Sequence, residues 1–150
     1  MARVMGVAKV EALFRRSAGL DIDDKNKVAL CLDTVESKLH DLLLVAEEKT
    51  LSNGRDEMLV HDLPITKGLS KTIREFEALN EEVPVEDVAK FVASLPPLKV
   101  SYSEEVREEL PKVAGGLMVA LAKMTKLFSA DRRPSVDDIE KAKQALDLTL

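Results

Sequence analysis

Glu36 and His40 are four residues apart in a stretch with helical apolar spacing, so their side chains share one helix face. Metal ligands in helical bundles have this arrangement, but such a site needs matching ligands from other helices. The internal repeat described below places Ala114 and Met118 at the equivalent positions. The sequence also lacks a glycine-rich phosphate loop, a Cys-x-x-Cys pair and a His-Glu-x-x-His motif. We therefore predict no metal site, no cofactor and no enzymatic activity.

Other residues that could do chemistry have simpler interpretations. Glutamates cluster at 47–48, 81–82 and 104–109, but without a nearby nucleophile they are typical of a solvated face. His61 is expected to lie on the surface or in a loop. Cys31 is the single cysteine, so it cannot form an intramolecular disulfide, and we predict a reduced, inert thiol.

Length and composition fit one globular domain. The chain has 150 residues, of which 45% are hydrophobic and only 3% aromatic, so its core must be aliphatic. The net charge of −5 is spread evenly and includes no basic tail, which counts against strong, unspecific binding to nucleic acid. No apolar run approaches the roughly 20 residues of a membrane span, and no signal peptide is visible. We expect a cytoplasmic protein that does not bind membranes.

An internal repeat organises the chain. After a shift of 78 residues, apolar positions of the first part fall on apolar positions of the second part, as Val10 does on Val88. Each copy of such a repeat is one supersecondary unit that buries its apolar face against another. We predict a first half at residues 1–80, a short linker at 81–84 and a second half at 85–150, with one joint core.

The apolar periodicity predicts helices in both halves and therefore an all-α fold. In the first half we expect a short helix at 6–17, a long helix of about 25 to 28 residues, and an extended piece at 57–60. A third helix is predicted to start near Asp62, with Pro64 tolerated in its first turn. The second half repeats this order, with helices predicted at 85–95, 103–128 and 136–150.

Two glycines stand out in the second long helix. Gly115 and Gly116 lie near its middle, at positions equivalent to Ser37 and Lys38 of the first half. Glycine inside a helix costs about 1 kcal/mol relative to alanine, so a compensating contact is expected. We predict that the two long helices cross closely at Ser37, Gly115 and Gly116.

The first half resembles archaeal and eukaryotic histones where Asn53-Gly54-Arg55 is followed, seven residues after the arginine, by Asp62-Leu63. The whole chain resembles a bacterial family of fused double histones, largely of uncharacterised function. This resemblance implies two tandem histone-fold motifs, each made of a short, a long and a short helix. Together they would form an intramolecular, histone-like pseudodimer.

The resemblance also implies ion pairs that hold the last loop of each half. In histones the loop arginine pairs with the aspartate at the start of the last helix, which here means Arg55 with Asp62. In the second half the equivalent pair is Arg132 with Asp138, although these residues are six positions apart instead of seven. Charge-assisted pairs of this kind are strong because arginine binds carboxylates in a bidentate way.

In a histone pair, the first loop of one half lies beside the second loop of the other. In this chain, one such pairing would place residues 21–25 beside Arg132 and Arg133. The acidic charges of the first loop and the basic charges of the second largely cancel. The other sets residues 55–56 against residues 99–102 and is mildly basic. These paired loops, together with the starts of the first helices, would face DNA.

Two interpretations of function remain open. One is a nucleoid-associated protein with weak, salt-sensitive, sequence-independent binding to double-stranded DNA, which the family resemblance favours. The other is an acidic histone-fold scaffold that binds a partner protein, or associates with itself, without binding DNA. The candidate DNA contacts are the basic residues of the paired loops and first helices: Arg3, Lys9, Arg15, Arg16, Arg55, Lys99, Arg132 and Arg133.

Overall fold

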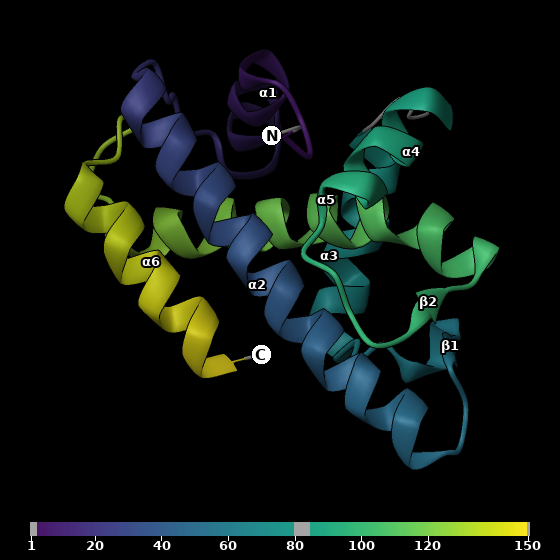
Figure 1. The fold of residues 1–150 in the computed structure, drawn as a ribbon. Helices are drawn as coiled ribbons and strands as arrows, with labels where there is room; N and C mark the ends of the chain where they lie inside the picture. The colour runs from purple at the N-terminus through teal and green to yellow at the C-terminus, as the bar shows by residue number, and fades with distance from the viewer. Residues whose placement is uncertain (1–2, 80–84, 150) are drawn as a thin grey trace.

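A computed structural model describes residues 3–79 and 85–149, which form six α-helices and two very short strands (Figure 1). A short, a long and a short helix follow one another twice along the chain. The elements, in chain order, are α1 (Val7–Ala18), α2 (Lys25–Ser52), β1 (Glu57–Met58), the 3-10 turn η1 (Val60–Asp62), α3 (Lys67–Leu79), α4 (Val85–Ser94), β2 (Ser101–Tyr102), α5 (Glu104–Phe128) and α6 (Val136–Thr149). The predicted linker at 81–84 lies outside the described residues.

Local capping residues set most of these boundaries. Gly19 ends α1 in a left-handed conformation with φ of 66°, which costs glycine little. The carboxylate of Asp24 caps α2 by accepting a hydrogen bond from the backbone N–H of Asn26 at 2.8 Å. Ser103 caps α5 in the same way through the N–H of Val106 at 3.2 Å. The helices predicted to start at residues 6, 85, 103 and 136 begin within one residue of those positions.

The prediction for the start of α3 is wrong. Asp62 lies in η1, and α3 begins only at Lys67, so Pro64 precedes the helix instead of occupying its first turn. The Asp62 carboxylate accepts from the N–H of Leu59 ahead of η1 and from Arg55, so it does not cap α3. Thr66 takes that role, because its hydroxyl accepts a hydrogen bond from the N–H of Leu69 at 3.1 Å.

Both halves contribute to one apolar core. Helix α5 packs against each of the other five helices, and in Figure 1 it crosses behind α2 near the middle of the molecule. The core is mainly aliphatic, as predicted from the composition. Its fully buried side chains come from both halves and include Phe14, Leu39, Met58, Leu117 and Ile139. Neither half could bury this surface alone.

The two glycines of α5 do not lie at the predicted crossing. A Cβ atom at Gly115 would collide with the ring of Phe76, and one at Gly116 would lie 2.9 Å from the backbone nitrogen of Ile73. Both neighbours belong to α3, whereas Ser37 of α2 is exposed. The glycines therefore allow α3, not α2, to approach α5 closely.

Candidate functional site

The two halves meet at two places where a loop of one half runs beside a loop of the other. At the first, β1 and β2 form a two-stranded parallel sheet in which Glu57 is in register with Ser101. At the second, the backbone N–H of Asp21 donates a hydrogen bond to the carbonyl of Arg132 at 2.7 Å. Both predicted loop pairings are confirmed. These paired loops are the candidate functional site, because most of the DNA contacts predicted from the sequence lie in or near them.

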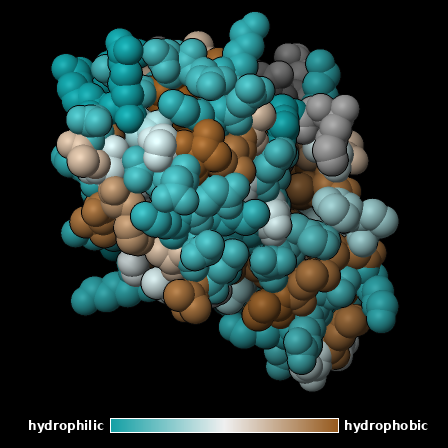
Figure 2. Space-filling view, turned by 90° about the vertical axis from the view of Figure 1, so that its left-hand side faces the viewer, coloured by the Kyte–Doolittle hydropathy of each residue, from teal (hydrophilic) through white to brown (hydrophobic). Residues whose placement is uncertain are grey.

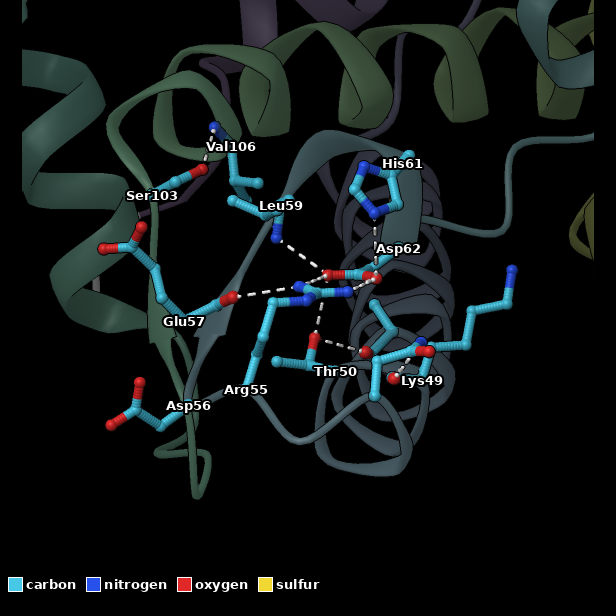
Figure 3. A network of polar contacts seen from close by, with 12 residues as sticks. Lys49, Thr50, Arg55, Asp56, Glu57, Leu59, His61, Asp62, Ser103 and Val106 are labelled. Carbon is cyan, nitrogen blue, oxygen red and sulfur yellow. Dashed lines mark hydrogen bonds and ion pairs between the residues drawn. The ribbon is translucent and has the colours of Figure 1, made fainter.

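A partly buried ion pair holds the first-half loop of the first pair of loops. The two terminal nitrogens of Arg55 donate to the two carboxylate oxygens of Asp62, Nη1 to Oδ2 at 2.7 Å and Nη2 to Oδ1 at 2.8 Å (Figure 3). Oδ2 of Asp62 also accepts from the backbone N–H of Leu59 at 2.8 Å and from the Thr50 hydroxyl at 3.0 Å. The predicted pair of Arg55 and Asp62 is therefore present and is bidentate.

This network fixes the charge of Asp62. The Arg55 guanidinium holds the pKa of the Asp62 carboxyl well below its usual range, and the Leu59 N–H and the Thr50 hydroxyl lower it further against the opposing effect of burial. The hydrogen bonds from Arg55 to the Asp62 carboxylate raise the pKa of Arg55. His61 lies next to the network but is exposed, with Nε2 3.8 Å from Oδ1 of Asp62. Because both oxygens of Asp62 are engaged, this carboxylate is poorly placed to bind a metal or to accept a proton.

The second pair of loops has a different ion pair from the one predicted. Nη2 of Arg132 lies 3.4 Å from Oδ2 of Asp21 in the neighbouring loop, not beside Asp138. Nη1 of Arg133 is 4.0 Å from Asp23, and Nε of Arg15 is 3.8 Å from Asp21. Three arginines, Arg132 and Arg133 of this loop and Arg15 of α1, thus surround two carboxylates of the loop that follows α1. The side chains of Arg132 and Arg133 remain largely exposed.

Asp138 caps a helix instead of holding Arg132. Its carboxylate accepts from the backbone N–H of Ser135 at 3.0 Å, and the Ser135 hydroxyl accepts from the N–H of Asp138 at 3.1 Å. This reciprocal arrangement is a capping box at the start of α6. The hydrogen bond from the Ser135 N–H lowers the pKa of Asp138.

The remaining predicted DNA contacts are scattered. Nη1 of Arg3 lies 2.7 Å from the carboxylates of both Asp33 and Glu36 on α2. Lys9 places its ammonium 5.8 Å from the centre of the Phe76 ring, a cation–π contact. The other two residues are exposed, and their side chains form no ion pair with any residue that the structure describes. They are Arg16, whose Nη1 donates to the carbonyl of Leu79 at 3.4 Å, and Lys99, whose backbone N–H donates to the Glu47 carboxylate at 2.6 Å.

The candidate DNA residues therefore do not form one basic surface. Arg15, Arg132 and Arg133 gather around an acidic loop, and Arg3 is held on α2. The sequence reading missed an exposed group of cations on α3, formed by Lys67, Lys71 and Arg74. Their spacing of four and three residues was visible in the sequence, but the resemblance to histones directed the predicted DNA contacts to the paired loops and first helices.

Other chemistry finds little support in the part of the chain that the structure describes. There, no group of three or more histidine, cysteine, aspartate or glutamate residues is placed to hold a metal ion. Cys31 is fully buried, and burial raises the pKa of its thiol to about 12, which suppresses the reactive thiolate. Among the same residues, no helix is both long and apolar enough to span a bilayer.

Comparison with known proteins places the chain among uncharacterised bacterial proteins. Two relatives from Aquifex aeolicus (strain VF5) are 29% and 31% identical to it, over 98% and 95% of this chain and 85% and 90% of their own lengths. Both are described only as uncharacterised proteins.

Two solved structures have the same fold over nearly their whole lengths. A protein from Thermus thermophilus is 41% identical, with a TM-score of 0.89 over 98% of this chain and 99% of that one. Protein AQ328 from Aquifex aeolicus is 28% identical, with a TM-score of 0.81 over 100% of this chain and 99% of that one. A family model described as a domain of unknown function, DUF1931, matches residues 10–147. This chain belongs to the DUF1931 family.

Proposed function

We propose that this protein is a non-enzymatic histone-fold pseudodimer that mediates protein association and does not wrap DNA. Support for the histone fold comes from the two short, long, short helix sets and from the loop pairing between halves. The bidentate pair of Arg55 and Asp62 lies at the position that the histone resemblance implies. The pseudodimer is then complete within a single chain.

One observation favours protein association over DNA binding. The arginines that would face phosphates at the paired loops contact carboxylates of the same chain: Arg132 contacts Asp21, Arg133 is near Asp23, and Arg55 is held by Asp62. A phosphate would have to displace these partners. The net charge of −5 opposes the approach of a polyanion as well.

Apolar side chains on the surface are consistent with a protein partner. In the C-terminal half of α2, Leu44, Val45 and Leu51 are each nearly half exposed. Figure 2 shows brown, apolar side chains gathered at the lower right, towards the end of the molecule that this part of α2 forms. Exposed apolar groups of this kind often mark contact surfaces between proteins.

Weak DNA binding is the second candidate function. The ion pairs of Arg132 and Arg133 are long and solvent-exposed, at 3.4 and 4.0 Å, and such pairs contribute little free energy. At low salt, phosphates could therefore compete with Asp21 and Asp23 for these arginines. The resulting binding would be independent of sequence, because no element is placed to read base edges.

Fluorescence anisotropy on a labelled duplex of about 30 base pairs distinguishes the two functions. We expect no saturable binding by the wild-type chain at 150 mM salt and weak binding at 20 mM. In the variant with Asp21→Asn and Asp23→Asn, the arginines are released, and binding at 20 mM salt should become roughly tenfold tighter. The slope of log K against log salt should steepen by about 0.9 for each arginine that gains a phosphate.

A variant with Arg132→Ala and Arg133→Ala serves as the control. Tight wild-type binding at 150 mM salt that this variant loses would overturn the scaffold proposal and establish DNA binding through the paired loops. Unchanged weak binding in all three proteins would instead show that these loops do not contact DNA.

A further inference from the structure

Helix α3 carries a row of basic side chains that the paired loops do not use. Lys67, Lys71 and Arg74 are all exposed, and their spacing of four and three residues places them on one stripe of the helix. The opposite face of α3 is buried against α5 through Leu69, Ile73 and Phe76. We call Lys67, Lys71 and Arg74 the α3 stripe. It extends over about 10 Å at 1.5 Å per residue.

The α3 stripe differs from the loop arginines in its partners. Within the described residues, none of its three side chains takes part in an ion pair. The neighbouring carboxylate of Glu75 is already bound by Lys123 of α5 at 2.5 Å. Three positive charges on one rigid helix therefore remain available to an external anion.

We propose that the α3 stripe binds an acidic segment of a partner protein, which would supply carboxylates at a matching spacing. The proposal rests on the proposed function of protein association and identifies the chemistry of the partner. Each ion pair at such an exposed site contributes little, but three on one pre-ordered helix face act together. Binding should therefore be modest and strongly dependent on salt.

A protein segment fits the α3 stripe better than a nucleic acid does. Duplex DNA is stiff and carries one charge per about 1.7 Å, so its contact would extend well beyond a stripe of about 10 Å. Single strands are held by stacking on aromatic side chains, but Phe76, the aromatic residue of α3, is buried.

The test measures binding of a fluorescein-labelled peptide of about ten glutamates to the full chain by anisotropy, at 50 and 300 mM salt. We expect saturable binding at 50 mM that weakens at least tenfold at 300 mM. The variant Lys67→Gln, Lys71→Gln and Arg74→Gln should weaken binding at least tenfold at 50 mM. All three side chains are exposed, so its thermal melt should match that of the wild type.

The matched control changes the same charge elsewhere, with Lys49→Gln, Lys90→Gln and Lys126→Gln on three other helices. It should weaken binding by less than about threefold. Equal losses in the two variants, or no binding by the wild type, would overturn the proposal. It would also be wrong if a 30-base-pair duplex bound more tightly than the peptide and lost that binding in the α3 variant. Duplex binding that depends on Arg132 and Arg133 would instead contradict only the proposed function.

Discussion

The loops that follow the two long helices occupy equivalent places in the repeat but are held in different ways. In the first half, residues 53–66 separate α2 from α3, and Asp62 lies inside this loop, buried and bound by Arg55. In the second half, residues 129–135 separate α5 from α6, and Asp138 already belongs to the helix. The longer loop is held by the ion pair of Arg55 with the buried Asp62. The shorter loop is held by the helix cap of Asp138 and by exposed ion pairs to the opposite loop.

This difference shows that the role of an aspartate depends on the donors around its carboxylate as well as on its position relative to a helix start. A carboxylate in the first turn finds backbone N–H groups that need an acceptor, and Asp138 binds that of Ser135. Asp62 also accepts from the N–H three residues upstream, that of Leu59 ahead of η1, but its carboxylate binds further donors. These are the Arg55 guanidinium and the Thr50 hydroxyl, whereas Arg132 pairs with Asp21 of the opposite loop.

The largest expected effect comes from removing the two aspartates in turn. Asp62→Ala should lower the free energy of unfolding by about 3 kcal/mol, because it leaves the partners of a buried carboxylate unpaired. Asp138→Ala removes a partly exposed cap and should cost clearly less. Urea denaturation of both variants measures the difference. Equal losses would mean that the loop of the first half is not held by a stronger contact.

The second comparison uses the equivalent positions in the two long helices. Gly116→Leu should destabilise by about 2 kcal/mol, since its side chain would press on the backbone of Ile73 in α3. Ser37→Leu, the control, lies on an exposed face of α2 and should leave the melting temperature nearly unchanged. A neutral melt for the glycine variant would show that α3 and α5 are not in close contact there.

Predictions that depended on local signals held best. Helix boundaries follow from apolar periodicity and from caps such as Asp24 and Gly19, which lie within a few residues of the helix they delimit. The start of α3 was misjudged because contacts from Thr50 and Arg55, up to twelve residues upstream, engage Asp62 and remove it from capping. Sequence spacing does not reveal such competition for a carboxylate.

Pairing partners were harder to predict than the places where pairing occurs. Two glycines correctly indicated a close helix contact, but which helix makes it depends on how six helices pack. Arg132 was expected to bind Asp138 of its own half, yet the neighbouring loop brings Asp21 nearer. The α3 stripe was predictable from spacing alone, because its three residues lie within the helix whether it starts at Asp62 or at Lys67.

The two loops should also differ in their response to acid. The pKa of Asp62 is lowered in the folded state, so its contribution to stability is complete above the unfolded pKa of about 3.9 and is lost as the pH falls towards the folded value. The difference in unfolding free energy between the wild type and Asp62→Asn should therefore shrink between pH 7 and pH 2.5. Asp138→Asn should show a smaller change over this range. A constant difference for Asp62→Asn would mean that its charge does not stabilise the fold.

The smallest effects should come from the helix caps, where the two halves are alike. Thr66 caps α3 and Ser135 caps α6, each through a hydroxyl that accepts a backbone N–H at 3.1 Å. Replacing either by alanine removes one such acceptor, so Thr66→Ala and Ser135→Ala should each cost about 1 kcal/mol in thermal or urea unfolding. Because the Ser135 hydroxyl and the Asp138 carboxylate each accept the other residue's backbone N–H and so fix the same turn, a double variant of Ser135→Ala with Asp138→Ala should cost less than the sum of the single changes. Additive losses would show that the capping box does not act as a unit. The difference between the two loops would then depend only on the ion pair of Arg55 with Asp62.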